Sequence, residues 1–213
     1  IQFAKNEFAY TLEGLYKILR DSYWISPIYS IREAENKIYQ LQIAKELGFN
    51  IPESIFTNSF RAAVDFYDRN SNACIVKPIK SGLIEDTVHP KVVFTNILTE
   101  KPSISEQIET FPNYFQQQII KKGDIRATFV GESEFTTLIH SQANLETRID
   151  WRRGESILKH SKYTLPIEIK NKCIKLLKKL NLRFGAIDFI LDNNDDLFFL
   201  EINPNGQWAW IEM

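Results

Sequence analysis

The sequence predicts an α+β fold built from packed layers of helices and strands. Helical and strand-like hydrophobic periodicities alternate along the 213 residues, and several strand-like segments follow one another across short polar turns, as in antiparallel hairpins. The sequence contains no internal repeat, low-complexity segment or long linker. These observations favour α+β layers over a doubly wound parallel sheet, in which helices would separate successive strands.

Capping and stop signals define the first elements. Residues 1–29 are rich in aromatic side chains and close with the breaker sequence WISP at 24–27. A helix is expected to begin at Ser30, because SIRE has the spacing of a capping box, and Gly48 supplies its end. A short strand follows at 54–57.

Periodicity and turn residues define the remaining elements. Strands are marked by β-branched and aromatic side chains between turn residues, and helices by apolar residues at helical spacing. We expect, in chain order, a helix over 59–69 capped by Asn58 or Ser59, a strand over 73–77, and a glycine-hinged loop and hairpin over 80–98 that turns near HPK. Then come strands over 114–120, 124–131 and 134–142, a helix over 166–181, and a closing hairpin within 184–208.

Composition excludes several classes of function. The net charge of −1 gives no bulk electrostatic reason to bind nucleic acid or an acidic membrane surface. No apolar run approaches the ~20 residues needed to span a bilayer. Cys74 and Cys173 are far apart and outside any CxxC pair, which argues against a disulfide framework or a structural zinc site. A cytoplasmic location is therefore expected.

The closing hairpin carries three oxygen-bearing side chains within strongly apolar runs: Asp188, Glu201 and Asn203. If the turn is the two residues Asn194–Asp195, Asp188 lies directly opposite Glu201, and Asn203 shares that face because side chains alternate. Opposed Cβ atoms are only ~4.5–5.5 Å apart, so two ionised carboxylates repel unless one gains a proton or both share a cation.

Two explanations of this acidic pair stay open at the level of spacing. Three oxygen donors on one strand face suit Mg²⁺, which accepts few carboxylates and completes its octahedron with phosphate oxygens and water. Alternatively, Arg126 or Arg152 neutralises the pair in a structural salt bridge. A one-residue slip in the turn would also move Asp188 to the other face.

Several basic side chains are candidates for binding phosphate, although the sequence has neither a GxxxxGK[ST] loop nor a GxGxxG motif. Lys77 ends a buried strand, where a charge is unexpected unless it is used. Lys37 lies in the first expected helix, and Asp124 and Arg126 share one face of their strand. Arg152 lies in a polar loop beside a tryptophan. For each basic residue the alternative is an ordinary surface charge.

Taken in order, these pieces resemble the ATP-grasp superfamily. The segments that carry the resemblance are NKIYQLQIAKELGFNIPESIFTNS (36–59), VKP (76–78), QQI (117–119), DIR (124–126) and DFIL…FLEINPNGQW (188–208). Within the superfamily they look most like the peptide-modifying ligases that make microviridins and related graspetides. EINPNGQWAWIE and SQANLETRIDWRR are the most specific stretches, and the resemblance runs from about residue 24 onward.

The resemblance implies an ATP-grasp fold, in which two α+β subdomains grip ATP. Residues 1–29 would be the remnant of an N-terminal region or linker. Residues 30–116 would form the central subdomain, with its hinged loop and hairpin, and 117–213 the C-terminal subdomain. Because the chain starts at Ile1 and stops at WIEM, we expect it to lack its N-terminal subdomain and the end of its C-terminal one.

The resemblance also implies roles for particular residues. Around the nucleotide these are Lys37 and Lys77 at the phosphates, Gly82 as the hinge of a covering loop, Gln117, Gln118 and Ile119 beside adenine, and Asp124 near the ribose or phosphates. Asp188, Glu201 and Asn203 would bind magnesium. Arg126 and Arg152 would hold the transferred phosphoryl group and the substrate carboxylate, since a guanidinium grips either bidentately. QQI departs from the acidic–aromatic pair common at this hinge.

The activity implied is an ATP- and Mg²⁺-dependent, ADP-forming ligase that acts on a precursor peptide with a leader and an acidic core. An Asp or Glu side chain would become an acyl phosphate, and a Ser or Thr hydroxyl or Lys amine would then attack it, forming an intramolecular ester or amide. Residues 83–98 would engage the leader. Other readings are a ligase that adds an amino acid to a peptide or protein terminus, and a non-catalytic nucleotide- or peptide-binding module. The oligomeric state is open, with a homodimer among the options.

Overall fold

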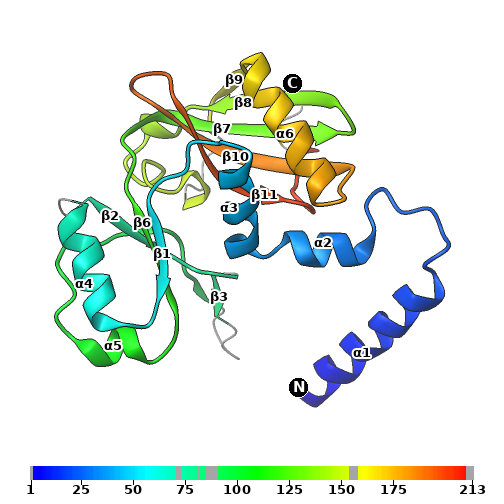
Figure 1. Ribbon diagram of the computed structural model, residues 1–213, viewed down its shortest axis with the longest axis horizontal. Coiled ribbons are helices and arrows are strands. Elements are labelled where there is room, and N and C mark those ends of the chain that lie inside the picture. The colour runs from blue at the N-terminus through cyan, green and yellow to red at the C-terminus, as the bar shows by residue number, and fades with distance from the viewer. Residues whose placement is uncertain (1, 71–72, 81, 85–90, 154–157, 210–213) are drawn as a thin grey trace.

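The computed structural model describes residues 2–70, 73–80, 82–84, 91–153 and 158–209. They form two lobes, from which helix α1 (Gln2–Ile18) projects without burying any side chain (Figure 1). Within the described ranges, no helix combines the length and the apolar character needed to cross a bilayer.

The larger lobe is a five-stranded antiparallel sheet covered on one face by two helices, α3 (Lys37–Glu46) and α6 (Ile167–Lys179) (Figure 1). The strand order is β11 (Leu197–Asn203), β10 (Phe184–Asp192), β7 (Lys121–Val130), β8 (Ser133–Ile139) and β9 (His160–Lys162). Buried side chains from both layers fill its core, among them Leu41, Ile43, Leu176, Ile187, Phe189 and Phe199.

The smaller lobe is a four-stranded antiparallel sheet with its own core. Its strand order is β1 (Ser54–Thr57), β6 (Asn113–Gln117), β2 (Cys74–Lys77) and β5 (Asn96–Ile97). Its helices are α4 (Phe60–Arg69) and α5 (Ser105–Glu109), and the core residues are Ala63, Phe66, Tyr67, Cys74 and Phe115. A separate two-stranded ladder joins β3 (Leu83–Ile84) to β4 (Lys91–Val92), and the turn predicted near HPK falls outside the described residues.

The helix predicted from Ser30 is two helices, α2 (Ile28–Ala34) and α3. The chain breaks at Asn36, whose side chain caps α3 by accepting a hydrogen bond from the Tyr39 backbone N–H (3.1 Å). Ser30 is not the N-cap that was predicted: it lies inside α2, where its hydroxyl accepts a bond from Asn181 Nδ2 (2.9 Å). By contrast, α4 follows Ser59, one of its two predicted caps.

The chain passes between the lobes before and after the smaller one. Helix α3 precedes the smaller lobe in sequence, yet its residues Leu41 and Ile43 lie in the larger core. Residues 118–120 lead back from β6 to β7. The proposed division at residues 116 and 117 follows the order of the sequence, whereas the packing places α3 with the larger lobe.

The closing hairpin has the predicted pairing but a different turn. Residues 193–195 form a three-residue turn closed by a hydrogen bond from Asp192 N to Asp196 O (3.0 Å), with Asp195 in the left-handed region (φ 68°). A bulge at Leu200 then shifts the register by one residue. The two departures cancel, so Asp188 still lies directly opposite Glu201, as predicted.

Candidate active site

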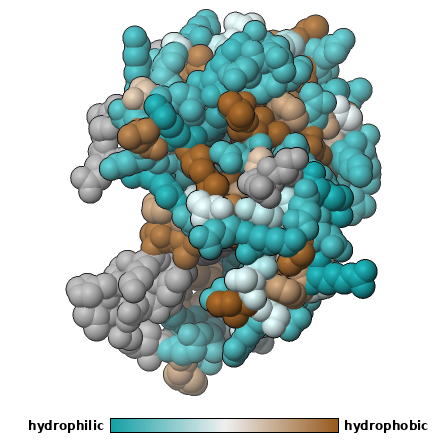
Figure 2. Space-filling model, turned by 90° about the vertical axis from the view of Figure 1, so that its left-hand side faces the viewer, coloured by the Kyte–Doolittle hydropathy of each residue, from teal (hydrophilic) through white to brown (hydrophobic). Residues whose placement is uncertain are grey.

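The candidate site is the cleft between the two lobes. It is bounded by the face of the larger sheet opposite α3 and α6, because Ile125, Ala127 and Phe129 of β7 point into the core and the residues between them point the other way. Figure 2 shows the lobes one above the other, with hydrophilic residues over most of the visible face. The charged residues that line the cleft are Lys37, Lys77, Lys121, Asp124, Asp150, Arg152, Asp188 and Glu201.

Two lysines from different elements reach Glu201 or its surroundings. Lys37, the first residue of α3, places its Nζ 3.0 Å from Glu201 Oε2 and 3.4 Å from the Pro78 carbonyl. Lys77 Nζ, at the end of β2, donates to Gln116 Oε1 (2.8 Å). Burial lowers the pKa of Lys77 to about 8, with the Lys37 charge acting in the same direction. An anionic ligand bound in the cleft would therefore interact favourably with both ammonium groups.

The opposed carboxylates have separate cations in this structure. Arg126 Nη1 lies 3.0 and 3.1 Å from the two oxygens of Asp188, whereas Glu201 faces Lys37. Burial raises the pKa of Asp188 to about 6, and Arg126 opposes the rise. Burial also raises the pKa of Glu201, but the charges of Lys37 and Lys77 lower it more. The sequence left open that Arg126 or Arg152 neutralises the acidic pair in a structural salt bridge, and the contact between Arg126 and Asp188 is such a salt bridge.

Arg126 is held beneath the chain that follows β11. Its side chain is only 6% exposed, and Nη2 donates to the Gln207 carbonyl (3.1 Å). A Cβ at Gly206 would come 2.7 Å from Arg126 Nη2 and 2.6 Å from the Ala186 Cβ, so this close crossing requires glycine. Arg126 therefore contacts Asp188 from the neighbouring strand β7, and it is not among the residues that line the cleft.

Arg152 occupies the opposite wall in a bidentate pair with Asp150. Its Nε and Nη2 lie 2.8 Å from the two oxygens of Asp150, which also accepts from the Thr95 backbone N–H of the smaller lobe (3.2 Å). Burial raises the pKa of Asp150. The Arg152 guanidinium and the backbone N–H groups of Thr95 and Arg152 outweigh this effect and hold the pKa well below its usual range. Asp150 thus links the lobes, and Arg152, about half exposed, faces the cleft.

A second buried ion pair lies deeper in the cleft. Lys121 Nζ contacts both oxygens of Asp124 (2.7 and 2.8 Å) and the Ile149 carbonyl (3.3 Å). Burial raises the pKa of Asp124, and Lys121 opposes the rise. Sequence reasoning singled out Asp124 but missed Lys121 and Asp150. The available signals were a lysine three residues before one predicted site residue and an aspartate two residues before another.

Comparison with known proteins identifies the family to which this fold belongs. Residues 34–213 match the model of the RimK-like ATP-grasp domain. The chain belongs to this ATP-grasp family. It is similar to a RiPP-associated ATP-grasp ligase of Chryseobacterium gregarium, solved in complex with ADP and a leader and core peptide (27% identity, TM-score 0.88, 99% of this chain and 65% of that one).

Two further relatives have lower similarity in structure or in extent. Macrocyclase MdnC of Microcystis aeruginosa MRC, bound with precursor peptide MdnA, is 30% identical, with a TM-score of 0.84 over 99% of this chain and 67% of that one. The uncharacterized protein MG012 of Mycoplasma genitalium is 28% identical over 46% of this chain and 36% of its own length. The ATP-grasp chain described here thus spans about two thirds of its solved relatives and about a third of MG012.

The ATP-grasp cleft brings together six of the residues predicted from the sequence and leaves the others outside its lining. Those in the cleft are Lys37, Lys77, Asp124, Arg152, Asp188 and Glu201. Gln117, Gln118 and Ile119 lie at the crossing between lobes, where the Gln117 and Gln118 N–H groups bond to the Glu53 and Ala73 carbonyls (2.8 and 2.7 Å). Their contact with adenine stays a prediction.

Gly82 and Asn203 also lie outside the cleft lining. A Cβ at Gly82 would come 1.9 Å from the Val93 carbonyl oxygen, so glycine is required there for close approach of the backbone. Asn203 is exposed, lies two residues from Glu201, and accepts a hydrogen bond from Asn205 N (3.2 Å). The hinge role of Gly82 and the metal role of Asn203 stay predictions.

The donor set of this ATP-grasp cleft fits magnesium that arrives with a nucleotide. Within the described ranges, no three His, Cys, Asp or Glu side chains form a cage that could hold an ion alone. Mg²⁺ needs no such cage, because it commonly takes one or two carboxylates and completes its shell with phosphate and water. Asp188 and Glu201 supply two carboxylates on adjacent strands, and Lys37 and Lys77 supply charge for phosphate.

Proposed function

We propose that this protein is an ATP-dependent, ADP-forming ligase that activates a carboxylate of a peptide. The observation that carries the proposal is the direct opposition of Asp188 and Glu201 on one side of a cleft, with Lys37 and Lys77 converging from other elements. Phosphoryl transfer depends chiefly on positioning and charge neutralisation, and this cleft offers both acidic and basic groups at fixed places.

Asp188 and Glu201 would hold the metal, with Asn203 next to them on β11. Magnesium supplies neutralisation of the phosphate charge when it is bound. Lys37, which is paired with Glu201, and Lys77, which is held by Gln116, would offset the charge of the phosphates. Arg126 holds Asp188 in position, because its Nη1 contacts both carboxylate oxygens and its Nη2 donates to the Gln207 carbonyl. We retain it as a candidate for binding the transferred phosphoryl group.

Arg152 is the best-placed residue to receive the substrate carboxylate. It lines the cleft and is about half exposed, and Asp150 orients its guanidinium through Nε and Nη2, which leaves Nη1 for a ligand. The cleft has a volume of about 60 Å³, far below the ~300 Å³ at which ligand pockets begin. The cleft must therefore widen to admit ATP, and residues 118–120, which connect the lobes, are the expected pivot. Closure afterwards would exclude water, which hydrolyses acyl phosphates.

A precursor peptide with a leader and an acidic core is the proposed substrate. Support comes from two relatives, at 27% and 30% identity, that were solved with a leader and core peptide or with a precursor peptide. The activated Asp or Glu side chain would be attacked by a Ser or Thr hydroxyl or a Lys amine of the same peptide, releasing phosphate and forming an ester or amide. The role of residues 83–98 in leader binding, a homodimer and a cytoplasmic location stay predictions from the sequence.

Mass spectrometry tests the proposal directly. The protein is incubated with ATP, Mg²⁺ and acidic peptides that also contain Ser, Thr or Lys, and ADP release is followed in parallel. We expect the peptide to lose the mass of one water for each cross-link. A gain in mass by one amino acid would identify a terminal ligase, and unchanged peptides with tight Mg·ADP binding would identify a non-catalytic binding module. Either outcome contradicts the proposed cross-linking.

A further inference from the structure

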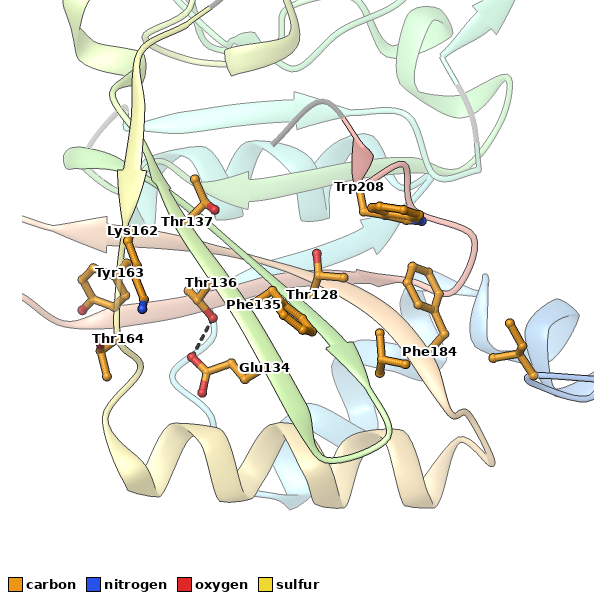
Figure 3. A pocket seen from close by; sticks show the side chains of 12 residues that line it. Thr128, Glu134, Phe135, Thr136, Thr137, Lys162, Tyr163, Thr164, Phe184 and Trp208 are labelled. Atoms are coloured by element: carbon orange, nitrogen blue, oxygen red, sulfur yellow. Dashed lines mark hydrogen bonds between the residues drawn. The ribbon is translucent and has the colours of Figure 1, made fainter. Parts of the chain in front are cut away.

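A second, larger cavity lies on the same face of the larger sheet as the cleft. It is a groove of about 810 Å³ at the other end of β7 and β10, within the range of ligand pockets. In Figure 3, Thr128 and Phe135 lie in its middle, Trp208 and Phe184 on one side, and Lys162 on the other. Both β7 and β10 therefore run from the candidate active-site cleft to the groove.

The groove exposes apolar side chains that normally seek burial. Phe135, Trp208 and Val130 are 61%, 54% and 50% exposed, although they line one continuous cavity. Contiguous exposed apolar surface of this kind commonly marks a binding site. Both a basic and an acidic side chain, Lys162 and Glu134, line the groove, so its apolar surface is the feature that would select a ligand.

Thr128 supplies an independent observation that points to a polar ligand group. Its side chain is almost fully buried (4% exposed), and its hydroxyl has no hydrogen-bond partner within the described part of the chain. Buried polar groups are nearly always paired, so a hydroxyl left unpaired in a cavity wall suits a ligand. A peptide backbone offers both N–H and C=O groups that could satisfy it.

The distance between groove and cleft fits a short stretch of peptide. Asp188 and Phe184 lie four residues apart on β10, which corresponds to ~13 Å at the usual strand rise. An extended peptide covers the same distance in about four residues. The Gly206–Gln207 segment crosses Arg126 between the two sites, so a peptide must pass over it and needs one or two residues more.

We propose that the groove binds an apolar side chain of the peptide substrate, four to six residues from the carboxylate bound in the cleft, and so selects which carboxylate is activated. This inference rests on the proposed function. Phe135, Val130 and Trp208 bury the apolar side chain, and Thr128 bonds to the peptide backbone. The groove therefore fixes the number of residues between the apolar side chain and the carboxylate that is activated.

A series of peptides that differ in the spacing between Glu and Leu tests this proposal. The probes are acetylated twelve-residue Gly/Ser peptides with one Glu and one Leu, three to seven residues apart, and a matched peptide with Ser in place of Leu. Isothermal titration calorimetry measures their dissociation constants with Mg·ADP present. Because burial of a leucine side chain corresponds to at least a tenfold change in affinity, we expect about tenfold tighter binding at spacings of four to six.

Two variants and one matched control locate the effect. Phe135→Ser should reduce the leucine advantage to less than threefold. Phe111→Ser, which changes a phenylalanine of similar exposure (58%) in the smaller lobe, should keep it. Thr128→Val conserves side-chain volume and should weaken every peptide about threefold to tenfold, whatever its spacing.

The outcomes separate the groove from the proposed function. Tight Mg·ADP binding without any leucine advantage, or a leucine advantage that survives Phe135→Ser, overturns the groove and leaves the ligase proposal standing. If the wild-type protein binds neither Mg·ADP nor any peptide, the ligase proposal fails and the groove assignment fails with it. Melting temperatures of all variants check that each is folded.

Discussion

Lys77→Met should make the ligand-free protein more stable while weakening nucleotide binding. The side chain of Lys77 lies in the cleft, and its pKa is lowered from 10.5 to about 8, chiefly by burial. At ~1.4 kcal/mol per pKa unit, this difference corresponds to ~3 kcal/mol that opposes the charged form in the folded state at pH 7. A methionine keeps most of the aliphatic stem and removes the charge.

The net change in the free energy of unfolding is smaller than this electrostatic contribution. The variant loses the bond from Lys77 Nζ to Gln116 Oε1, which contributes ~1 kcal/mol, and Lys77 is only partly buried. We therefore expect a gain of ~1–2 kcal/mol in the free energy of unfolding. Mg·ADP affinity should fall at least about tenfold, because a charge-assisted contact to phosphate is lost.

The pH dependence gives the effect a distinctive sign. Between pH 8 and 10.5 the unfolded chain keeps the Lys77 proton while the folded protein loses it, so wild-type stability rises with pH relative to the variant. Urea unfolding at pH 7 and 9.5 should show the advantage of the variant shrinking. Lys80→Met, at an exposed lysine three residues away, is the control and should change neither stability nor affinity. A Lys77→Met protein that is less stable at pH 7, or that binds Mg·ADP as the wild type does, would refute this reasoning.

Two further predictions concern Asp188 and Asp150. Because burial raises the pKa of Asp188 to about 6, Mg·ADP affinity measured by calorimetry should fall as the pH drops from 7 to 5 and Asp188 takes up a proton; constant affinity over this range would contradict it. The same raised pKa makes this group's contribution to folding more favourable toward pH 4, so unfolding does not explain the loss. Asp150→Asn should destabilise the protein by ~1–3 kcal/mol in urea unfolding, because it breaks the pair with Arg152 and weakens the link to Thr95. The low pKa of Asp150 keeps this difference constant between pH 5 and 8, and an unchanged unfolding curve would show that the link contributes nothing.

Local signals were enough to predict most elements of the fold. The strand at Ser54–Thr57 and the helix after Ser59 have turn or cap residues at their ends, and no competing signal lies nearby. The helix predicted from Ser30 failed because Asn36 offers a second cap inside an otherwise helical pattern. Sequence spacing cannot rank two adjacent caps whose choice depends on how α2 and α3 pack.

The acidic pair of the candidate site and the basic residues around it were predictable, but not which cation pairs with which carboxylate. Alternation along two apolar strands placed Asp188 opposite Glu201, and the errors in turn length and bulge cancelled. The partners Arg126 and Lys37 come from β7 and α3, so their assignment depends on tertiary packing. The chain crossing at Gly206, which covers Arg126, has no local signal beyond the glycine itself.

The most direct test of the central claim is the gain in ADP affinity that magnesium produces, measured by calorimetry with and without the ion. Wild-type protein should bind ADP at least about tenfold more tightly with Mg²⁺, and Glu201→Gln should lose that gain while remaining folded. Asp195→Asn, in the turn of the same hairpin, conserves the left-handed residue and should keep the gain. If Glu201→Gln binds Mg·ADP as tightly as the wild-type protein, Glu201 is not a metal ligand and the account is contradicted.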